Sequence, residues 1–297
     1  MNNHPPTWRV WLLAARPKTL PAAVVPVLVG SAFAAHDGLF QGWPALLCLG
    51  FALLVQIGTN YANDYGDFVR GADTPQRTGP ARAVAAGWVT PAAMRRAAAL
   101  VFALALAAGF DLVRFGGWGM LPLGLLCIGC GAAYTGGPYP LSYNGLGDLF
   151  VFLFFGLVAV GATYWVQARA LTPDVLLAAV AVGLLAANLL VANNWRDREG
   201  DARAGKRTLV VRFGERAGRW QYLLAVLFSF AVPFVLAGRG YGRWGLLPLV
   251  ALPLGRHCLV ALQPGAPPDA VVRLLARSAA YLALYGVLLA AAVWPWP

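Results

Sequence analysis

The residues best suited to chemistry in this sequence are carboxylates gathered in two short clusters. The chain of 297 residues has only 12 acidic residues, and six of them fall in the clusters: Asp64, Asp67 and Asp73, then Asp197, Glu199 and Asp201. Each cluster directly follows an apolar block of about 20 residues, the length of a membrane span. Carboxylates at the end of a membrane helix cost free energy unless they are paired or liganded, which favours a functional site. A solvated helix end balanced by nearby arginine is the alternative.

Helical spacing places the oxygen donors of each cluster on one face of its helix. These donors are Asn63, Asp64 and Asp67 in the first cluster, and Asn193, Asp197 and Asp201 in the second. Carboxylate and amide oxygens are hard ligands suited to Mg²⁺, which binds proteins through one or two carboxylates together with substrate phosphates. The spacing therefore predicts a metal-dependent site for a diphosphate substrate.

The two clusters also repeat each other at one constant offset, 130 residues, as from Asp67 to Asp197. The matching positions are Ala62, Asn63, Asp67, Arg77 and Thr78 against Ala192, Asn193, Asp197, Arg207 and Thr208. This pattern indicates an internal duplication. Because an even number of predicted spans separates the copies, both face the same side and the repeat is parallel rather than inverted.

Basic residues follow both clusters closely. Arg70 and Arg77 follow Asp67 of the first cluster, and Lys206 and Arg207 come after the second cluster. Guanidinium groups match phosphate oxygens in bidentate geometry. Two acidic clusters under a basic lid suit the ionisation of an allylic diphosphate, since cations stabilise the leaving diphosphate and a dry pocket protects the carbocation.

The elements that must position these residues are membrane helices. The chain is 59% hydrophobic and 12% charged, with a mean hydropathy of +0.63, which excludes a soluble single domain. Apolar blocks of about 20 residues also exclude an outer-membrane barrel. We expect an all-α polytopic membrane protein with nine transmembrane helices near 18–35, 43–62, 92–112, 116–134, 143–166, 173–195, 220–238, 244–263 and 272–294.

Basic residues fix the predicted orientation. Of the 23 lysines and arginines, 18 fall in the N-terminal arm and the loops on one side, and four fall in the loops on the other. By the positive-inside rule the N-terminus is cytoplasmic, the C-terminus is outside, and both acidic clusters face the cytoplasm. The net charge of +11 is explained in this way, so no nucleic-acid partner is expected.

Four stretches carry a resemblance to a known family: RPKTLPAAVVPVLVG from Arg16, QIGTNYANDYGDFVRGADTPQRTGPARAV from Gln56, YTGGPYPLSYNGLGDLFVFLFFG from Tyr134, and NNWRDREGDARAGKRTLVVRFG from Asn193. In these stretches the chain resembles the UbiA-type superfamily of intramembrane aromatic prenyltransferases. The resemblance is strongest to the branch that acts on 1,4-dihydroxy-2-naphthoate in menaquinone biosynthesis.

The resemblance implies one transmembrane domain over residues 1–297, built around a central cavity. It implies two Mg²⁺ ions and a prenyl diphosphate held by the two motifs, with Asn63, Asp64, Asp67, Asp197 and Asp201 as metal ligands. The superfamily often has a further acid four residues after the one matching Asp67. Gly71 stands there in this chain, and whether Asp73 replaces that acid is open.

The implied reaction transfers a polyprenyl group from an all-trans polyprenyl diphosphate to 1,4-dihydroxy-2-naphthoate. Carbon dioxide and diphosphate are lost, and a demethylmenaquinone is formed in its reduced, quinol form. The implied location is the lipid bilayer of the bacterial inner membrane, with the site on the cytoplasmic side. Prenyl chain length, oligomeric state and the choice between Mg²⁺ and Mn²⁺ are left open.

Three further candidates have competing interpretations. Tyr139 could offer its ring or hydroxyl to the allylic cation, or could belong to an interfacial aromatic belt. Arg16 and Lys18 could bind the substrate carboxylate or diphosphate, or could anchor the first helix at the headgroups. For the whole chain, the alternatives are a prenyltransferase for another aromatic acceptor such as 4-hydroxybenzoate, and an ion-coupled transporter.

Overall fold

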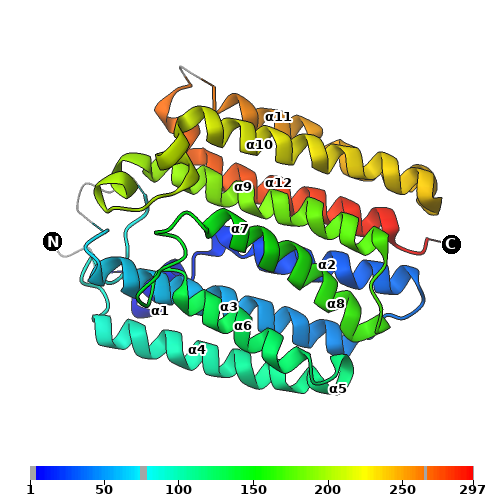
Figure 1. Cartoon of the computed structure of the whole chain (residues 1–297), viewed down its shortest axis with the longest axis horizontal. Helices are drawn as coiled ribbons and strands as arrows, with labels where there is room; N and C mark the ends of the chain where they lie inside the picture. Colours follow the sequence, from blue (N-terminus) through cyan, green and yellow to red (C-terminus); the bar gives the residue numbers. More distant parts are fainter. Residues whose placement is uncertain (1–4, 74–78, 264–265, 297) are drawn as a thin grey trace.

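The computed structural model describes residues 5–73, 79–263 and 266–296, and every regular element in these ranges is helical. The helices run roughly parallel to one long axis and form a bundle (Figure 1). The elements are α1 (Thr7–Ala14), η1 (Pro17–Thr19), α2 (Pro21–His36), α3 (Gly42–Val69), α4 (Pro91–Asp111), α5 (Val113–Gly116), α6 (Met120–Ala133), α7 (Gly147–Val151), η2 (Phe152–Val158), α8 (Ala159–Ala168), α9 (Pro173–Arg203), α10 (Leu209–Leu236), η3 (Ala237–Tyr241), η4 (Gly242–Ala251), α11 (Leu252–Val260) and α12 (Pro268–Val293).

The expected all-α, multi-pass architecture is confirmed. Six helical segments are long and apolar enough to cross a membrane: Gly42–Val69, Pro91–Gly116, Gly147–Ala168, Pro173–Arg203, Leu209–Val260 and Asp269–Val293. The pair Thr7–Thr19 and Pro21–His36, bent by 54°, makes a seventh if it counts as one span.

The number of spans differs from the expected nine in two places. The predicted span at 116–134 contains α6, whose 14 residues are shorter than a full crossing. The two spans expected at 220–238 and 244–263 form one helical run, which is kinked where Gly240 and Gly242 have φ of 107° and 56°. Helices α10 and α11, before and after this kink, contact each other (Figure 1). Nine spans and a cytoplasmic N-terminus therefore remain predictions.

The helices that carry the two acidic clusters end on the same side of the bundle. Helix α3 carries Asp64 and Asp67 of the first cluster at its C-terminal end, and α9 carries the second cluster. The apolar part of α9 is buried, with Val182, Leu185 and Val191 no more than 1% exposed. Burial on all sides fits a helix that is apolar all round, and it fixes the polar end of α9 against its neighbours.

The segment before α2 breaks at two prolines. Arg16 precedes Pro17, adopts a left-handed conformation with φ of 53°, and caps η1, after which α2 starts at Pro21. Side chains of α3 hold this break in place: Gln56 Nε2 donates to Thr19 Oγ1 at 3.0 Å, and Asn60 Nδ2 donates to the Ala15 carbonyl at 2.9 Å. These bonds fix Arg16 beside the first acidic cluster.

Two glycines allow the backbones of η2 and α9 to meet. A Cβ added at Gly156 would lie 2.6 Å from both the Ala179 carbonyl oxygen and the Gly183 Cα. A Cβ at Gly183 would lie 2.7 Å from the Phe152 carbonyl oxygen. Small residues at helix contacts are the usual means of close packing in membranes. Here the contact coincides with a π-helical segment, a feature that is frequent at functional sites.

Candidate active site

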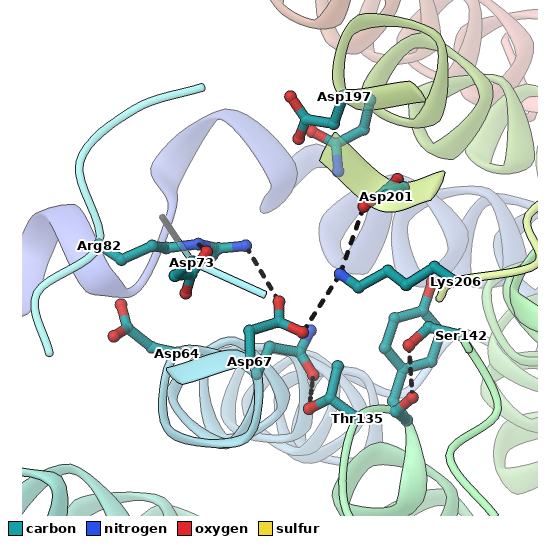
Figure 2. Close-up of polar contacts among 12 residues, drawn as sticks. Asp64, Asp67, Asp73, Arg82, Thr135, Ser142, Asp197, Asp201 and Lys206 are labelled. Carbon is teal, nitrogen blue, oxygen red and sulfur yellow. Dashed lines mark hydrogen bonds and ion pairs between the residues drawn. The ribbon is translucent and has the colours of Figure 1, made fainter. Parts of the chain in front are cut away.

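Asp67, at the C-terminal end of α3, lies at the centre of the polar cluster in Figure 2. Its Oδ1 accepts a hydrogen bond from the Tyr143 hydroxyl at 3.0 Å and lies 3.2 Å from Lys206 Nζ. Its Oδ2 lies 3.5 Å from Arg82 Nη2. The Asp67 side chain is only 3% exposed, and the two cations and the hydroxyl provide the polar partners that a buried carboxylate needs.

Lys206 joins the two acidic clusters (Figure 2). Besides its contact with Asp67, its Nζ lies 3.5 Å from Asp201 Oδ1, and it lies 5.0 Å from the ring centroid of Tyr143. The predicted meeting of the two clusters at one site is therefore observed in the geometry.

Asp64 is held by the backbone of the loop that follows the first cluster. Its two carboxylate oxygens accept hydrogen bonds from the amides of Ala83 and Val84 at 3.1 and 3.0 Å, and the residue is 1% exposed. The neighbouring Asn63 Oδ1 accepts from Thr135 Oγ1 at 3.0 Å. Asp64 thus anchors the loop that brings Arg82 to Asp67.

The second cluster has its own internal cation. Arg196 Nε and Nη2 donate to the two oxygens of Asp197, each at 2.7 Å, and Nη2 also donates to Asn193 Oδ1 at 2.6 Å. This bidentate pair fixes the orientation of Asp197.

Two cavities meet at these residues. The larger, of about 430 Å³, is mostly apolar, with Phe51, Val55, Phe154 and Leu189 in its wall, and its polar end holds Arg16, Asn63, Asp64, Arg82 and Arg196. The smaller, of about 50 Å³, is lined by the charged groups Asp67, Asp197, Asp201 and Lys206. Arg16, Asn63, Arg82, Tyr134 and Asn193 line both. We call the larger, mostly apolar cavity the chamber, and the smaller, charged cavity together with the polar end of the larger one the head.

The head suits a divalent cation bound together with phosphate. Among the described residues no group of three or more His, Cys, Asp or Glu is arranged to hold a metal ion by itself. However, Asp67 and Asp201 already hold one cationic group between them, the Lys206 ammonium. Mg²⁺ needs only one or two carboxylates when substrate phosphates and water complete its shell. The donor set therefore fits Mg²⁺.

The structure brings most of the predicted site residues together. One or both cavities are lined by Arg16, Lys18, Asn63, Asp64, Asp67, Asn193, Asp197, Asp201 and Lys206. Lys18 lies at the exposed margin of the larger cavity.

The other predicted residues are placed differently. Arg70 donates to the carbonyls of Thr135 and Gly137 and packs over the Tyr143 ring, so it supports the loop. The Arg207 side chain is exposed, and its backbone amide donates to the Tyr143 carbonyl at 2.9 Å. Tyr139 is 61% exposed and lines neither cavity. Arg77 lies outside the described residues.

Sequence reasoning missed Tyr143, Arg82 and Arg196. Burial, followed by the adjacent Asp67 carboxylate, raises the pKa of the Tyr143 hydroxyl, so this group stays protonated and donates to Asp67. Asn193 and Arg196 are three residues apart on a helix, a spacing that could have identified their pairing. No local signal distinguishes Tyr143 from Tyr139, since both lie in the same loop.

Comparisons with known proteins agree with this geometry. Residues 23–276 match the model of the UbiA prenyltransferase family. Proteins named 1,4-dihydroxy-2-naphthoate octaprenyltransferase from Mycobacterium tuberculosis (strain ATCC 25618 / H37Rv) and Escherichia coli (strain K12) are each 41% identical. The alignments cover 86% of both chains for the first, and 83% of this chain and 82% of the relative for the second.

Solved structures share the fold at low sequence identity. A UbiA homolog from Archaeoglobus fulgidus bound to DMAPP and Mg²⁺ has a TM-score of 0.63 at 16% identity, covering 94% of this chain and 98% of the other. The apo structure of a UbiA homolog from Aeropyrum pernix K1 has a TM-score of 0.68 at 16% identity, covering 91% and 95%. The sequence match over most of the length and the shared fold agree, and the chain belongs to the UbiA prenyltransferase family.

Proposed function

We propose that this protein transfers a polyprenyl group from a polyprenyl diphosphate to 1,4-dihydroxy-2-naphthoate in menaquinone biosynthesis. The observation that carries the proposal is the apolar chamber of about 430 Å³ that meets a head lined by both acidic clusters. A prenyl chain suits the chamber, and a diphosphate suits the head. The names of the relatives from Mycobacterium tuberculosis and Escherichia coli supply the acceptor.

The residues that would hold Mg²⁺ are Asn63, Asp64, Asp67, Asp197 and Asp201, with two ions expected. Bound Mg²⁺ supplies positive charge that stabilises the departing diphosphate. Lys206, Arg82 and Arg16 place further positive charge around the same head, where it attracts the phosphate oxygens. Binding of the diphosphate by Arg70, Arg77 and Arg207, as predicted from their closeness to the acidic clusters in the sequence, stays a prediction.

The chamber protects the reactive centre from water. Its wall beyond the head is formed mostly by aliphatic and aromatic side chains, among them Phe154 and Leu189. The electron-rich acceptor ring attacks the allylic carbon there, and loss of carbon dioxide restores the aromatic diol. Tyr134 lines both cavities at the junction where the carbon–oxygen bond breaks, so it is better placed than Tyr139 to face the cation.

The orientation in the membrane belongs to the same proposal. Nine spans are expected from the apolar blocks, and a cytoplasmic N-terminus with the head on the cytoplasmic side of a bacterial inner membrane is expected from the distribution of basic residues. Water-soluble diphosphate would then be released into the compartment that contains the soluble acceptor.

The test is prenyl transfer by the purified protein. 1,4-Dihydroxy-2-naphthoate and 4-hydroxybenzoate are supplied as parallel acceptors, each with Mg²⁺ and with a chelator. We expect Mg²⁺-dependent product from the naphthoate. Product from the benzoate alone would assign the enzyme to another pathway. No product from either acceptor would contradict the proposal and favour the alternative assignment as an ion-coupled transporter.

A further inference from the structure

The backbone of Lys206 is fixed by the end of helix α9. The Lys206 amide donates to the Asp201 carbonyl at 2.9 Å, and the Gly205 amide donates to the Ala202 carbonyl at 3.1 Å. Gly205 has φ of 74°, and the two hydrogen bonds together form the glycine-terminated helix cap known as a Schellman motif. The cap fixes the backbone position of Lys206, while the flexible four-carbon side chain allows the ammonium to reach different partners.

The ammonium of Lys206 lies among groups that a metal would also use. Its Nζ is 3.2 Å from Asp67 Oδ1 and 3.5 Å from Asp201 Oδ1, and the lysine side chain is only 12% exposed. Two cations cannot share these oxygens at such distances without strong repulsion, because the surroundings are largely dehydrated. A divalent cation that binds both carboxylates must therefore displace the ammonium.

Lys206 differs from the other two cations of the head in the acidic clusters that it contacts. Arg82 pairs with Asp67 and Asp73, both of the first cluster, and Arg196 pairs with Asp197 within the second. Of these three cations, Lys206 is the one that bridges the clusters. Displacing it changes the link between α3 and α9, and the released charge lies beside the space that the diphosphate would occupy.

We propose that Lys206 competes with the divalent cation for Asp67 and Asp201 and, once displaced, binds the diphosphate. The inference rests on the proposed function, since it assumes the metal and diphosphate site described above. Lys206 then has opposite effects on the two ligands: it weakens binding of bare metal, and it strengthens binding of the diphosphate that accompanies the metal. The consequence is positive coupling between metal and diphosphate, so that both bind together.

The first test uses the unmodified protein. The chain has two lysines, Lys18 and Lys206, so acylation by an amine-reactive reagent is readily followed by mass spectrometry. We expect Mg²⁺ alone to raise the labelling rate of Lys206 severalfold and added inorganic diphosphate to lower it again. Lys18, which is exposed, is the internal control for the Mg²⁺ step. Labelling of Lys206 that falls or stays constant with Mg²⁺ would overturn the proposal.

The second test measures metal binding directly, by Mn²⁺ titration followed by electron paramagnetic resonance in the absence of diphosphate. Lys206→Met should bind Mn²⁺ at least about fivefold more tightly than the unmodified protein, the lower end of typical coupling between linked sites. Adding a prenyl thiodiphosphate should remove that advantage. Lys206→Arg keeps the charge and should resemble the unmodified protein, and Lys206→Gln replaces Lys206→Met if the latter does not fold.

The matched control is Arg203→Met. It removes an exposed positive charge from the last turn of the same helix and should leave Mn²⁺ affinity within about twofold, because exposed charges are screened. If the unmodified protein and Lys206→Met bind Mn²⁺ equally well while the unmodified protein still transfers prenyl groups, the competition by Lys206 is refuted and the proposed function stands. An unmodified protein that binds neither Mn²⁺ nor prenyl thiodiphosphate would refute the proposed function as well.

Discussion

At the scale of single residues, the site is a set of carboxylates whose charge is balanced by the chain itself. Asp67 contacts Lys206, Arg82 and the Tyr143 hydroxyl, and Asp197 contacts Arg196. Charges held in this way are poised for exchange, since each cation can turn from a carboxylate to a phosphate oxygen at small cost in Coulomb energy. The carboxylates that these cations leave are then free to coordinate the metal.

The first prediction concerns Asp67. Asp67→Asn keeps the shape of the side chain and removes the charge needed by a metal ligand, so kcat/KM for prenyl transfer should fall by about 100-fold or more. The matched control is Asp269→Asn, because Asp269 is exposed and pairs with Arg273 on α12, away from the two cavities. Near-normal turnover of Asp67→Asn would contradict the metal assignment.

The second prediction compares two tyrosines. Tyr143→Phe keeps the ring beneath Lys206 and removes the hydroxyl that donates to Asp67, so kcat/KM should fall by about tenfold and more Mg²⁺ should be needed for half-maximal rate. Tyr139→Phe is measured in parallel, because its hydroxyl lies outside both cavities. A larger loss in Tyr139→Phe than in Tyr143→Phe would mean that the loop rearranges during the reaction.

Part of this site is readable from the sequence, and part is not. The partners Asn63, Asp67, Asp197 and Asp201 are readable because helical spacing is local and both clusters lie on helices. The bridge made by Lys206 depends on how α3 and α9 pack, which spacing along one helix does not reveal. The acids are thus predictable, and the identity of the cations that meet them requires the tertiary structure.

At the scale of helices, close packing between η2 and α9 holds the wall of the chamber. Gly156 and Gly183 let the two backbones touch, while Phe154 and Phe155 of the same π-helical segment face the chamber. In this segment Gly156 therefore packs against α9, and the two phenylalanines line the chamber. The sequence contains these residues, but their assignment to faces follows the unusual winding of the π-helix and not the ordinary helical period.

The third prediction tests that contact. Gly156→Ala places a Cβ 2.6 Å from backbone atoms of α9, which cannot move aside as a side chain could, so the protein should lose about 1–3 kcal/mol of stability. The control is Gly161→Ala in the adjoining helix, where the added Cβ would meet only Leu171 Cδ2 at 3.6 Å. Thermal unfolding in detergent is the measurement. Equal melting temperatures for the two variants would show that the helices are not in contact as described.

At the scale of the whole molecule, the chain separates its charged end from the rest of the bundle. Helix α1 and the acidic ends of α3 and α9 lie at one end in Figure 1, and α12 ends at the other. The total number of spans was less predictable than the architecture. Hydropathy locates the apolar blocks well. It does not show that one block forms a helix of only 14 residues, or that two blocks join in one helical run with a kink at two glycines, so the number of membrane crossings is harder to predict.

The fourth prediction addresses orientation. Alkaline phosphatase fused to the C-terminus should be active in a bacterial host, because this enzyme folds only outside the cytoplasm, and a fusion within the loop between α9 and α10 should be inactive. The second fusion is the control for expression and insertion. An inactive C-terminal fusion together with an active one between α9 and α10 would reverse the orientation and place the charged head outside.

The separation of the chamber from its charged head also determines how the product departs. In the proposed reaction both substrates are anions, one through its diphosphate and the other through its carboxylate, and Lys206, Arg82 and Arg16 line the head as the positive groups that would attract them. The reaction removes both anionic groups, so the joined molecule has nothing left for the head to hold. Its affinity then comes only from apolar walls that compete with lipid of equal apolarity. Loss of the two anionic groups thus lowers the affinity of the site for the product. We therefore expect the product to leave by partition into the bilayer, with no conformational step needed to release it.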